Sequence, residues 1–487
     1  MNRRHFVKVK SVLKVLGIVL FWEAVLMVPS LLISIIDNSY EIKAFVITIA
    51  ATAVTGFILS RFEIDSAEMR KREGYAAVAL SWLVMSIFGA LPFYLSGSIP
   101  SYIDALFETV SGFTTTGSSI IRDVEIIPRG LLFWRSFTHW IGGMGVLVFT
   151  MALFPSIGGR PVFLMRAESP GPSPGKLVPK IGESSKILYI IYAVMTVIVI
   201  ILLIAAGMPV FNSFIYAFGT AGTGGFSMDA LSVGAYNNPW IDWIITIGMF
   251  LFGVNFTLYY LLIKKEFKQI FKNEEFRLYC FYTGLAIALI VINVIPRFNY
   301  DFFEALRYSA FTVSTLVTTT GYATTDFNLW PMFSKSVLLA LMFFGACAGS
   351  TAGGVKSVRI LVLFKAFYYE IKHTIHPKSV QTIKVDGKSL DDDTLKSIMI
   401  FFFAYVLIII LSVIIVSLDN FDFITSFSAV IATISNIGPG FGIVGPMGNF
   451  ADFSVLSKIT FIADMIIGRL EILPVIILFS PVIWKRN

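Results

Sequence analysis

The sequence has 487 residues, of which 56% are hydrophobic and 14% are charged, and its mean hydropathy is +0.79. This composition excludes a soluble globular domain. The net charge of +7 does not indicate nucleic acid as a partner, because the basic residues border apolar runs of about 20 residues, the length a helix needs to cross a bilayer.

Apolar runs and shorter amphipathic pieces alternate along the chain. Two spans are predicted at 11–36 and 42–60, and a third at 75–95 leads into an amphipathic piece at 101–111, a Gly/Thr-rich break and a further span at 130–154. The same order of span, half-length piece, break and span repeats three more times, at 184–264, 276–369 and 394–484.

The sequence therefore predicts an all-α integral membrane protein in which four parallel helix–pore loop–helix repeats surround a central pore. Two extra transmembrane helices precede the repeats. The predicted boundaries are 1–70 for these two helices and 71–157, 158–270, 271–385 and 386–487 for the repeats.

Lysine and arginine predict the orientation of these spans. Most of the 38 basic residues lie near the two termini and in the connections between repeats, whereas the connections that carry the breaks are rich in acids. By the positive-inside rule, ten spans cross the cytoplasmic membrane, both termini face the cytoplasm and the breaks open outward. The outer acids either concentrate cations or only follow the topology rule and cap the half-helices, and the sequence leaves both readings open.

The four breaks combine glycine with threonine or asparagine, at 113–118, 222–226, 318–322 and 435–440. A dehydrated monovalent cation needs a ring of oxygens, which backbone carbonyls from four converging loops can supply. Glycine tolerates the dihedrals that aim carbonyls at one axis, and threonine adds hydroxyls without charge. Four breaks at the same place in four units favour a pore over simple connecting turns.

With these breaks, nearly the whole chain resembles the superfamily of potassium uptake proteins that includes TrkH, TrkG and KtrB. The segments 139–145 and 168–177 and the two extra N-terminal spans resemble TrkH in particular. The resemblance implies potassium uptake through a channel-like pore, with K⁺, possible Rb⁺ and some Na⁺ as transported ions and no organic cofactor.

The resemblance also implies a selectivity filter with three residues in each loop. These are Thr115, Thr116 and Gly117; Gly222, Thr223 and Gly224; Thr319, Thr320 and Gly321; and Asn436, Ile437 and Gly438. Each loop keeps one glycine where tetrameric K⁺ channels have two, so weaker discrimination against Na⁺ is a hypothesis here.

Small residues at 345–354, including Gly345, Gly349, Gly353 and Gly354, interrupt the inner span of the third repeat. Such residues also permit tight helix packing, but two glycine clusters in ten positions predict partial unwinding. The resemblance implies that this segment is an intramembrane gate loop that obstructs the pore below the filter.

Arg469 lies midway along the last span, where a charge is a functional-site hypothesis by default. The resemblance implies a pore-facing barrier beside the gate loop. The alternative is a buried group paired with Asp464, with Glu471 or with loop carbonyls.

The chain carries neither a phosphate-binding loop nor a nucleophile–base–acid set at plausible spacing, so an enzyme is not predicted. The alternative function is an ion-coupled secondary transporter, a Na⁺ or H⁺ symporter of K⁺ or of an organic solute, although such folds often have inverted repeats. The resemblance also implies a cytosolic TrkA-type nucleotide-binding regulatory subunit and a homodimer within membrane lipid.

Overall fold

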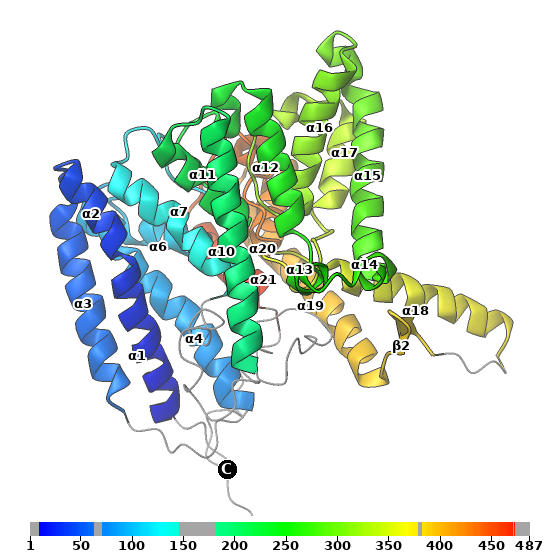
Figure 1. Cartoon of the computed structure of the whole chain (residues 1–487), viewed down its shortest axis with the longest axis horizontal. Helices are drawn as coiled ribbons and strands as arrows, with labels where there is room; N and C mark the ends of the chain where they lie inside the picture. The colour runs from blue at the N-terminus through cyan, green and yellow to red at the C-terminus, as the bar shows by residue number, and fades with distance from the viewer. Residues whose placement is uncertain (1–8, 63–70, 146–180, 378–381, 471, 473–487) are drawn as a thin grey trace, which may run out of the picture.

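The computed structural model describes the chain except residues 1–8, 63–70, 146–180, 378–381, 471 and 473–487. Apart from one two-stranded hairpin, the regular structure of the described residues is helical (Figure 1). The segment 168–177, one of the segments that resemble TrkH, lies outside the described residues.

The first two predicted spans form a pair of packed helices. The first is α1 (Val9–Leu26) followed by α2 (Val28–Ile36), since a proline in the first turn of α2 begins a new helix there. The second is α3 (Ile42–Ser60), with the predicted bounds. A Cβ added to Gly17 or Gly56 would collide with the backbone of the other helix, so these two glycines allow α1 and α3 to touch.

Four groups of helices follow, each with a long helix, a short helix and a second helix in that order. They are α4 (Lys71–Gly89) with α5 (Leu91–Leu95), α6 (Tyr102–Phe113) and α7 (Arg129–Gly143); α10 (Ile181–Ala205), α11 (Val210–Gly222), α12 (Pro239–Phe252) and α13 (Phe256–Ile263); α15 (Glu274–Val294), α16 (Phe302–Val317), α17 (Met332–Leu341) and α18 (Ser357–Ile375); and α19 (Asp392–Val416), α20 (Phe423–Ile434) and α21 (Val455–Leu470).

Smaller elements connect these helices. They are α14 (Phe267–Lys272), the strands β1 (Lys384–Val385) and β2 (Lys388–Ser389), and the 3-10 helices η1 (Ser232–Tyr236), η2 (Ile295–Phe298), η3 (Phe327–Leu329), η4 (Ser417–Asp419) and η5 (Gly442–Val444). The boundary predicted between residues 385 and 386 falls inside the β1–β2 hairpin.

Among the described residues, six helices are long and apolar enough to cross a membrane, or seven if the bent pair α12–α13 is one span. The second helices of the first three groups, α7, α12 and α17, have only 15, 14 and 10 residues, and α21 is described over 16 residues. The short helices α6 and α20 have 12 residues each, which reach about half of a bilayer core of roughly 30 Å. The other two helices before the breaks, α11 and α16, have 13 and 16 residues. Because the sequence predicts all four as half-length pieces, we refer to α6, α11, α16 and α20 as the half-membrane helices.

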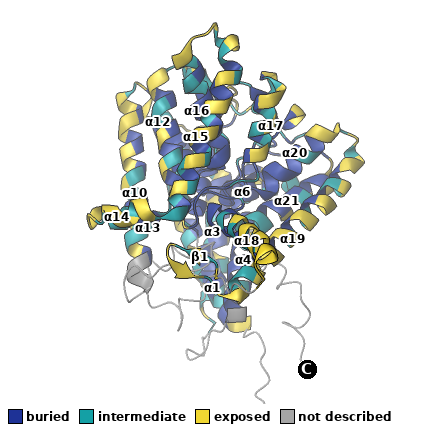
Figure 2. Ribbon diagram, turned by 90° about the vertical axis from the view of Figure 1, so that its right-hand side faces the viewer, coloured by how far each residue is buried: buried dark blue, intermediate teal, exposed yellow. Residues whose placement is uncertain are grey.

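Buried residues gather in the middle of the molecule, around the short helices, whereas the outer helices expose apolar side chains (Figure 2). Ile201 on α10, Ile292 on α15 and Phe403 on α19 are 58%, 74% and 70% exposed. Apolar side chains that face outward along helices of this length fit contact with lipid tails.

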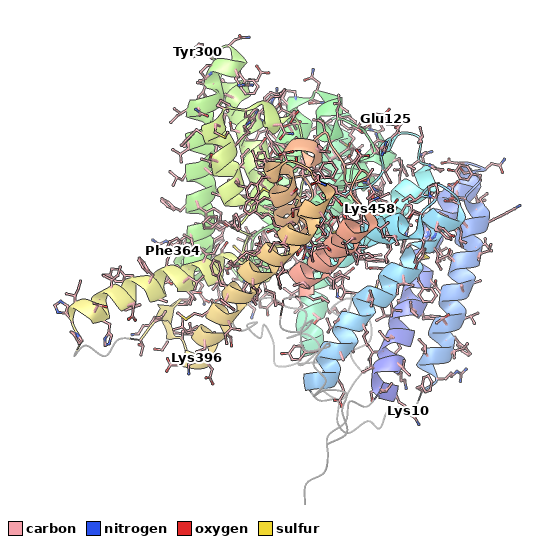
Figure 3. All side chains as sticks on the ribbon, turned by 180° about the vertical axis from the view of Figure 1, so that it is seen from behind. Lys10, Glu125, Tyr300, Phe364, Lys396 and Lys458 are labelled. Carbon is pink, nitrogen blue, oxygen red and sulfur yellow. The ribbon has the colours of Figure 1, made fainter. Side chains whose placement is uncertain are left out.

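The two ends of the bundle can be recognised by the labelled residues that lie there. Lys10 and Lys396 lie at one end, while Glu125 and Tyr300 lie at the other (Figure 3). The helix α18 projects sideways from the bundle at the lysine end (Figure 1). We refer to the end that carries Lys10 and Lys396 as the lysine-rich end.

Candidate functional site: four converging loops and the segment beneath them

The four half-membrane helices end in the same turn. The residue after the helix, or one beyond, has a positive φ of 54° or 55° although it is not glycine; these residues are Thr115, Thr223, Thr319 and Asn436. The next N–H then donates to the carbonyl five residues back, from Thr116 to Ser111, Gly224 to Gly219, Thr320 to Thr315 and Ile437 to Ala432, at 2.8–2.9 Å. Such a left-handed helix end costs a non-glycine residue roughly 1–2 kcal/mol, so its occurrence in four different sequences points to a shared constraint.

A glycine with positive φ follows each of these turns. The four are Gly117, Gly225, Gly321 and Gly438, with φ of 81°, 81°, 87° and 98°. A Cβ on each would crowd a carbonyl oxygen of another loop, Gly117 meeting Gly224, Gly225 meeting Thr320, Gly321 meeting Ile437 and Gly438 meeting Thr116. Each loop thus touches the next and the last touches the first, so the four loops form a closed ring.

In backbone geometry, the part of the second loop that matches the other three begins one residue after the predicted triplet, which was Gly222, Thr223 and Gly224. Gly222 is the last residue of α11, and the residues equivalent to those of the other loops are Thr223, Gly224 and Gly225. Gly222 and Gly224 are required for a different reason, which is close contact with His139. A Cβ on Gly222 would collide with the His139 carbonyl, and one on Gly224 with the His139 ring. The signal that identifies Gly225 is the aromatic residue after it, since Phe226 corresponds to Tyr322 in the third loop.

Each loop contributes one carbonyl to the contacts that close the ring, those of Thr116, Gly224, Thr320 and Ile437. A cavity of about 140 Å³ lies against all four ring glycines and extends toward the outer connections. The first and third loops each contain a pair of hydrogen-bonded hydroxyls. Thr114 Oγ1 lies 2.8 Å from Thr116 Oγ1, and Thr318 Oγ1 lies 2.8 Å from Thr320 Oγ1.

The fourth loop lacks this hydroxyl pair, because Ile437 stands at the place of Thr116 and Thr320, and it carries an amide, Asn436, at the place of Thr115 and Thr319. Asn436 Nδ2 donates to Thr116 Oγ1 and to the carbonyl of Met465, both at 2.9 Å. The asparagine that departs from the Thr-Thr pattern therefore ties the fourth loop to the first loop and to α21.

A buried ion pair between Glu108 and Arg135, which was not predicted from the sequence, connects the first two loops. Glu108 on α6 accepts hydrogen bonds from Arg135 Nε at 2.6 Å, from Ile120 N at 2.9 Å and from Ser119 Oγ at 3.0 Å. Arg135 donates onward to the carbonyl of Ser227 at 2.8 Å. Its guanidinium also lies 3.5 Å from the centre of the Phe226 ring.

His139 on α7 joins the same two loops nearer the ring. Its Nδ1 donates to the carbonyl of Gly112 at 2.7 Å, and its Nε2 accepts from the N–H of Phe226 at 3.3 Å. These two partners fix a neutral imidazole with its proton on Nδ1. No spacing rule relates Glu108, Arg135 and Phe226 in the sequence, so only the folded structure identifies this network.

Replacing Glu108 with glutamine is expected to loosen the first two loops and to lower the ratio of Rb⁺ to Na⁺ uptake several-fold. Breaking a buried ion pair leaves Arg135 uncompensated beside the ring, which costs roughly 3–5 kcal/mol. Ion competition in vesicles with the purified protein measures the ratio. Glu304→Gln is the matched control, because Glu304 begins the equivalent helix α16 and makes a more exposed pair with Arg307. An unchanged ratio in a folded Glu108→Gln protein would contradict this role.

Residues 342–356, between α17 and α18, are not helical, as expected for an unwound segment at 345–354. The segment lies directly against the ring, because Gly353 N donates to Thr319 Oγ1 at 2.7 Å. A Cβ on Gly353 would also lie 2.8 Å from the carbonyl oxygen of Ser435. The glycines of the segment therefore permit a backbone that touches the third and fourth loops.

The segment also docks on the break between α12 and α13, where the chain bends by 94°. Cys347 N donates to the carbonyl of Gly253, and Phe256 N donates to the carbonyl of Gly349, both at 3.0 Å. Backbone groups that two broken helices leave open thus satisfy one another, as irregular backbone inside a membrane protein requires.

Arg469 reaches two different elements with its guanidinium. It donates to the carbonyl of Thr351 in the segment at 2.8 Å, and to those of Gly142 and Gly143 at the end of α7 at 2.6 and 2.8 Å. Asp464 instead accepts from Ser412 Oγ at 2.8 Å. Of the predicted partners, loop carbonyls are therefore present, while Glu471 lies outside the described residues.

Apolar helices of membrane-spanning length, packed around four converging loops, define a helical integral membrane protein. The family model for TrkH, a cation transport protein, matches residues 38–486. The chain belongs to this TrkH family.

Two relatives and one solved structure align with this chain over nearly its full length and nearly their own. The Trk system potassium uptake protein TrkH of Salmonella typhimurium is 35% identical over 99% of this chain and 100% of the relative. The Trk system potassium uptake protein TrkG of Escherichia coli is 33% identical over 100% of both. The crystal structure of the potassium transporter TrkH from Vibrio parahaemolyticus superposes with a TM-score of 0.88 and 31% identity, over 98% of this chain and 100% of that one.

Proposed function

We propose that this chain takes up K⁺ across the cytoplasmic membrane through a pore whose selectivity filter is the ring of four loops. The observation that carries the proposal is the closed ring, in which one carbonyl of each loop lies against the positive-φ glycine of a neighbouring loop. Relatives that match the chain over their full length are named potassium uptake proteins, which supports the same ion.

A carbonyl ring suits a dehydrated monovalent cation, because its oxygens replace the hydration shell without binding the ion through a full charge. The four half-membrane helices α6, α11, α16 and α20 add to this, since each ends at the ring and directs the negative end of its dipole there. The filter residues are then Thr115, Thr116 and Gly117; Thr223, Gly224 and Gly225; Thr319, Thr320 and Gly321; and Asn436, Ile437 and Gly438.

The segment 345–354 is the proposed gate, with Gly345, Gly349, Gly353 and Gly354 in its backbone and Arg469 as a tie beside it. Its contacts with Thr319 Oγ1 and with the break at Gly253 support this role, because they hold the segment against the ring, and we propose that it obstructs the pore from the cytoplasmic side. The lysine-rich end of the bundle then faces the cytoplasm, with both termini on that side. A TrkA-type nucleotide-binding subunit at this end and a second copy of the chain complete the proposed assembly.

Uptake of radioactive Rb⁺ into vesicles that contain the purified protein tests the proposal. With a membrane potential imposed, negative inside, we expect uptake that unlabelled K⁺ suppresses more strongly than Na⁺ does. The same assay with and without a pH or Na⁺ gradient separates a pore from a symporter. Uptake that requires either gradient and ignores the potential would contradict the pore.

A further inference from the structure

The base of the proposed gate loop is closed by backbone hydrogen bonds between its two ends. Gly345 N donates to the carbonyl of Val355 at 2.8 Å, and Ser357 N donates to the carbonyl of Ala346 at 3.1 Å. The loop therefore leaves and rejoins the helical framework at nearly one point, and whatever fixes this point fixes the loop.

A carboxyl group from another helix lies at that point. Glu275, in the first turn of α15, is 5% exposed. Its Oε1 accepts hydrogen bonds from Ala348 N at 2.6 Å and from Val358 N at 3.0 Å. A single oxygen thus joins the outgoing arm of the loop to the first turn of α18, two places that are distant from Glu275 in the sequence.

We propose that Glu275 is a positioning residue that holds the gate loop across the pore; this inference rests on the proposed role of the loop as the gate. A buried N–H without a partner is costly at this depth, so Ala348 and Val358 keep their positions while the carboxyl is present. The amino end of α18 also favours a negative charge beside it.

Glu275 and Arg469 hold different parts of the loop by opposite chemistry. The guanidinium of Arg469 donates a hydrogen bond to the carbonyl of Thr351, in the part of the loop near the ring. The carboxyl of Glu275 accepts hydrogen bonds from N–H groups at the base of the loop. The hydrogen bonds described here join the two residues to different partners, so each residue holds its own part of the loop.

The position of Glu275 is itself set from the lysine-rich end of the bundle. Asn273 caps α15 by accepting from Phe276 N at 2.8 Å. Asp386, in the turn of the β1–β2 hairpin, accepts from Glu274 N and from Asn273 Nδ2, both at 2.8 Å. Hydrogen bonds therefore join this exposed hairpin to the first turn of α15, and Glu275 of the same turn is hydrogen-bonded to the gate loop and to α18.

Two variants of Glu275 test the inference on the full chain in vesicles. Glu275→Met removes the acceptor at similar length, and Glu275→Gln keeps an acceptor oxygen but removes the charge. The matched control is Glu274→Gln, because Glu274 lies on the same turn and its carboxylate pairs with Lys365 instead. Radioactive Rb⁺ uptake driven by a membrane potential gives the first readout.

The second readout is the reaction of Cys347 with a water-soluble maleimide. Cys347 lies next to Ala348 and is fully buried, and the chain has one other cysteine, Cys280, which a Cys280→Ser background removes. We expect Glu275→Met to raise both the labelling rate and Rb⁺ uptake about tenfold or more, because losing even one of its two hydrogen bonds to a charged group changes an equilibrium by about that factor. Glu275→Gln should give a smaller rise in both, and Glu274→Gln no change.

The outcomes separate this inference from the proposed function. Unchanged labelling in the folded Gln and Met variants would overturn the role of Glu275 and leave the gate loop as proposed. Faster labelling without faster uptake would show that the loop moves but does not obstruct the pore, which overturns the gate and this inference together. A rise in both with an unaltered preference for Rb⁺ over Na⁺ supports the inference, since the filter is then intact.

Discussion

Replacing Gly321 with alanine is expected to abolish K⁺ uptake, to the level of vesicles without protein. Gly321 has a φ of 87°, which costs an alanine roughly 1–2 kcal/mol. The larger effect is steric, because the new Cβ would overlap the carbonyl oxygen of Ile437 and lie 2.8 Å from Cδ of Pro439. The third loop must then move away from the fourth, and the ring of carbonyls opens. Radioactive Rb⁺ uptake measures the loss.

Gly207→Ala is the control that separates backbone strain from the break in the ring. Gly207 has a similar φ of 94°, but no atom lies within 4 Å of a Cβ at that position. In this variant the strained backbone should lower the free energy of unfolding, while uptake is retained. If both variants lost uptake equally, general destabilisation would explain the effect and the ring would not. Normal uptake by a folded Gly321→Ala protein would contradict the filter directly.

Features that depend on local sequence were predicted well. The bounds of α3 matched the predicted apolar run, and the unwound segment at 345–354 followed from its density of glycine. The first predicted span, 11–36, corresponds to one candidate membrane span at Val9–Ile36, within which Pro29 accompanies the start of a new helix at Val28. The four breaks were found at the correct places because glycine and threonine interrupt apolar periodicity there.

Features that depend on how distant segments meet were missed. The sequence Gly222-Thr-Gly-Gly225 offers three glycines, and the one that belongs to the ring is set by where α11 ends and by contact with Thr320. The ion pair between Glu108 and Arg135 also requires the packing of α6 against α7. Glu275 reads as an ordinary acid in a first helical turn until the gate loop is folded against it.

Replacing Arg469 with glutamine is expected to raise Rb⁺ uptake about tenfold or more when no regulatory subunit is present. Arg469 donates to Thr351 of the gate loop and to Gly142 and Gly143 at the end of α7. A hydrogen bond from a charged donor contributes about 1.5–3 kcal/mol, and 1.4 kcal/mol changes an equilibrium tenfold. Losing this tie therefore shifts the loop toward the open state. Arg129→Gln, which breaks a half-exposed ion pair with Asp37 at the outer end, is the control and should leave uptake unchanged.

Arg469→Lys distinguishes the two ways in which the arginine could restrain ions. Lysine keeps the positive charge but lacks the planar set of donors that reaches three carbonyls on two elements. If the charge itself is the barrier to cations, the lysine variant conducts as slowly as the parent. If the hydrogen bonds hold the loop closed, it conducts nearly as fast as the glutamine variant. We expect the second result, because the guanidinium directs its donors at Thr351 and at α7, so its main effect on conduction is mechanical. Unchanged uptake in the glutamine variant, with lowered thermal stability, would instead show that Arg469 only stabilises the fold.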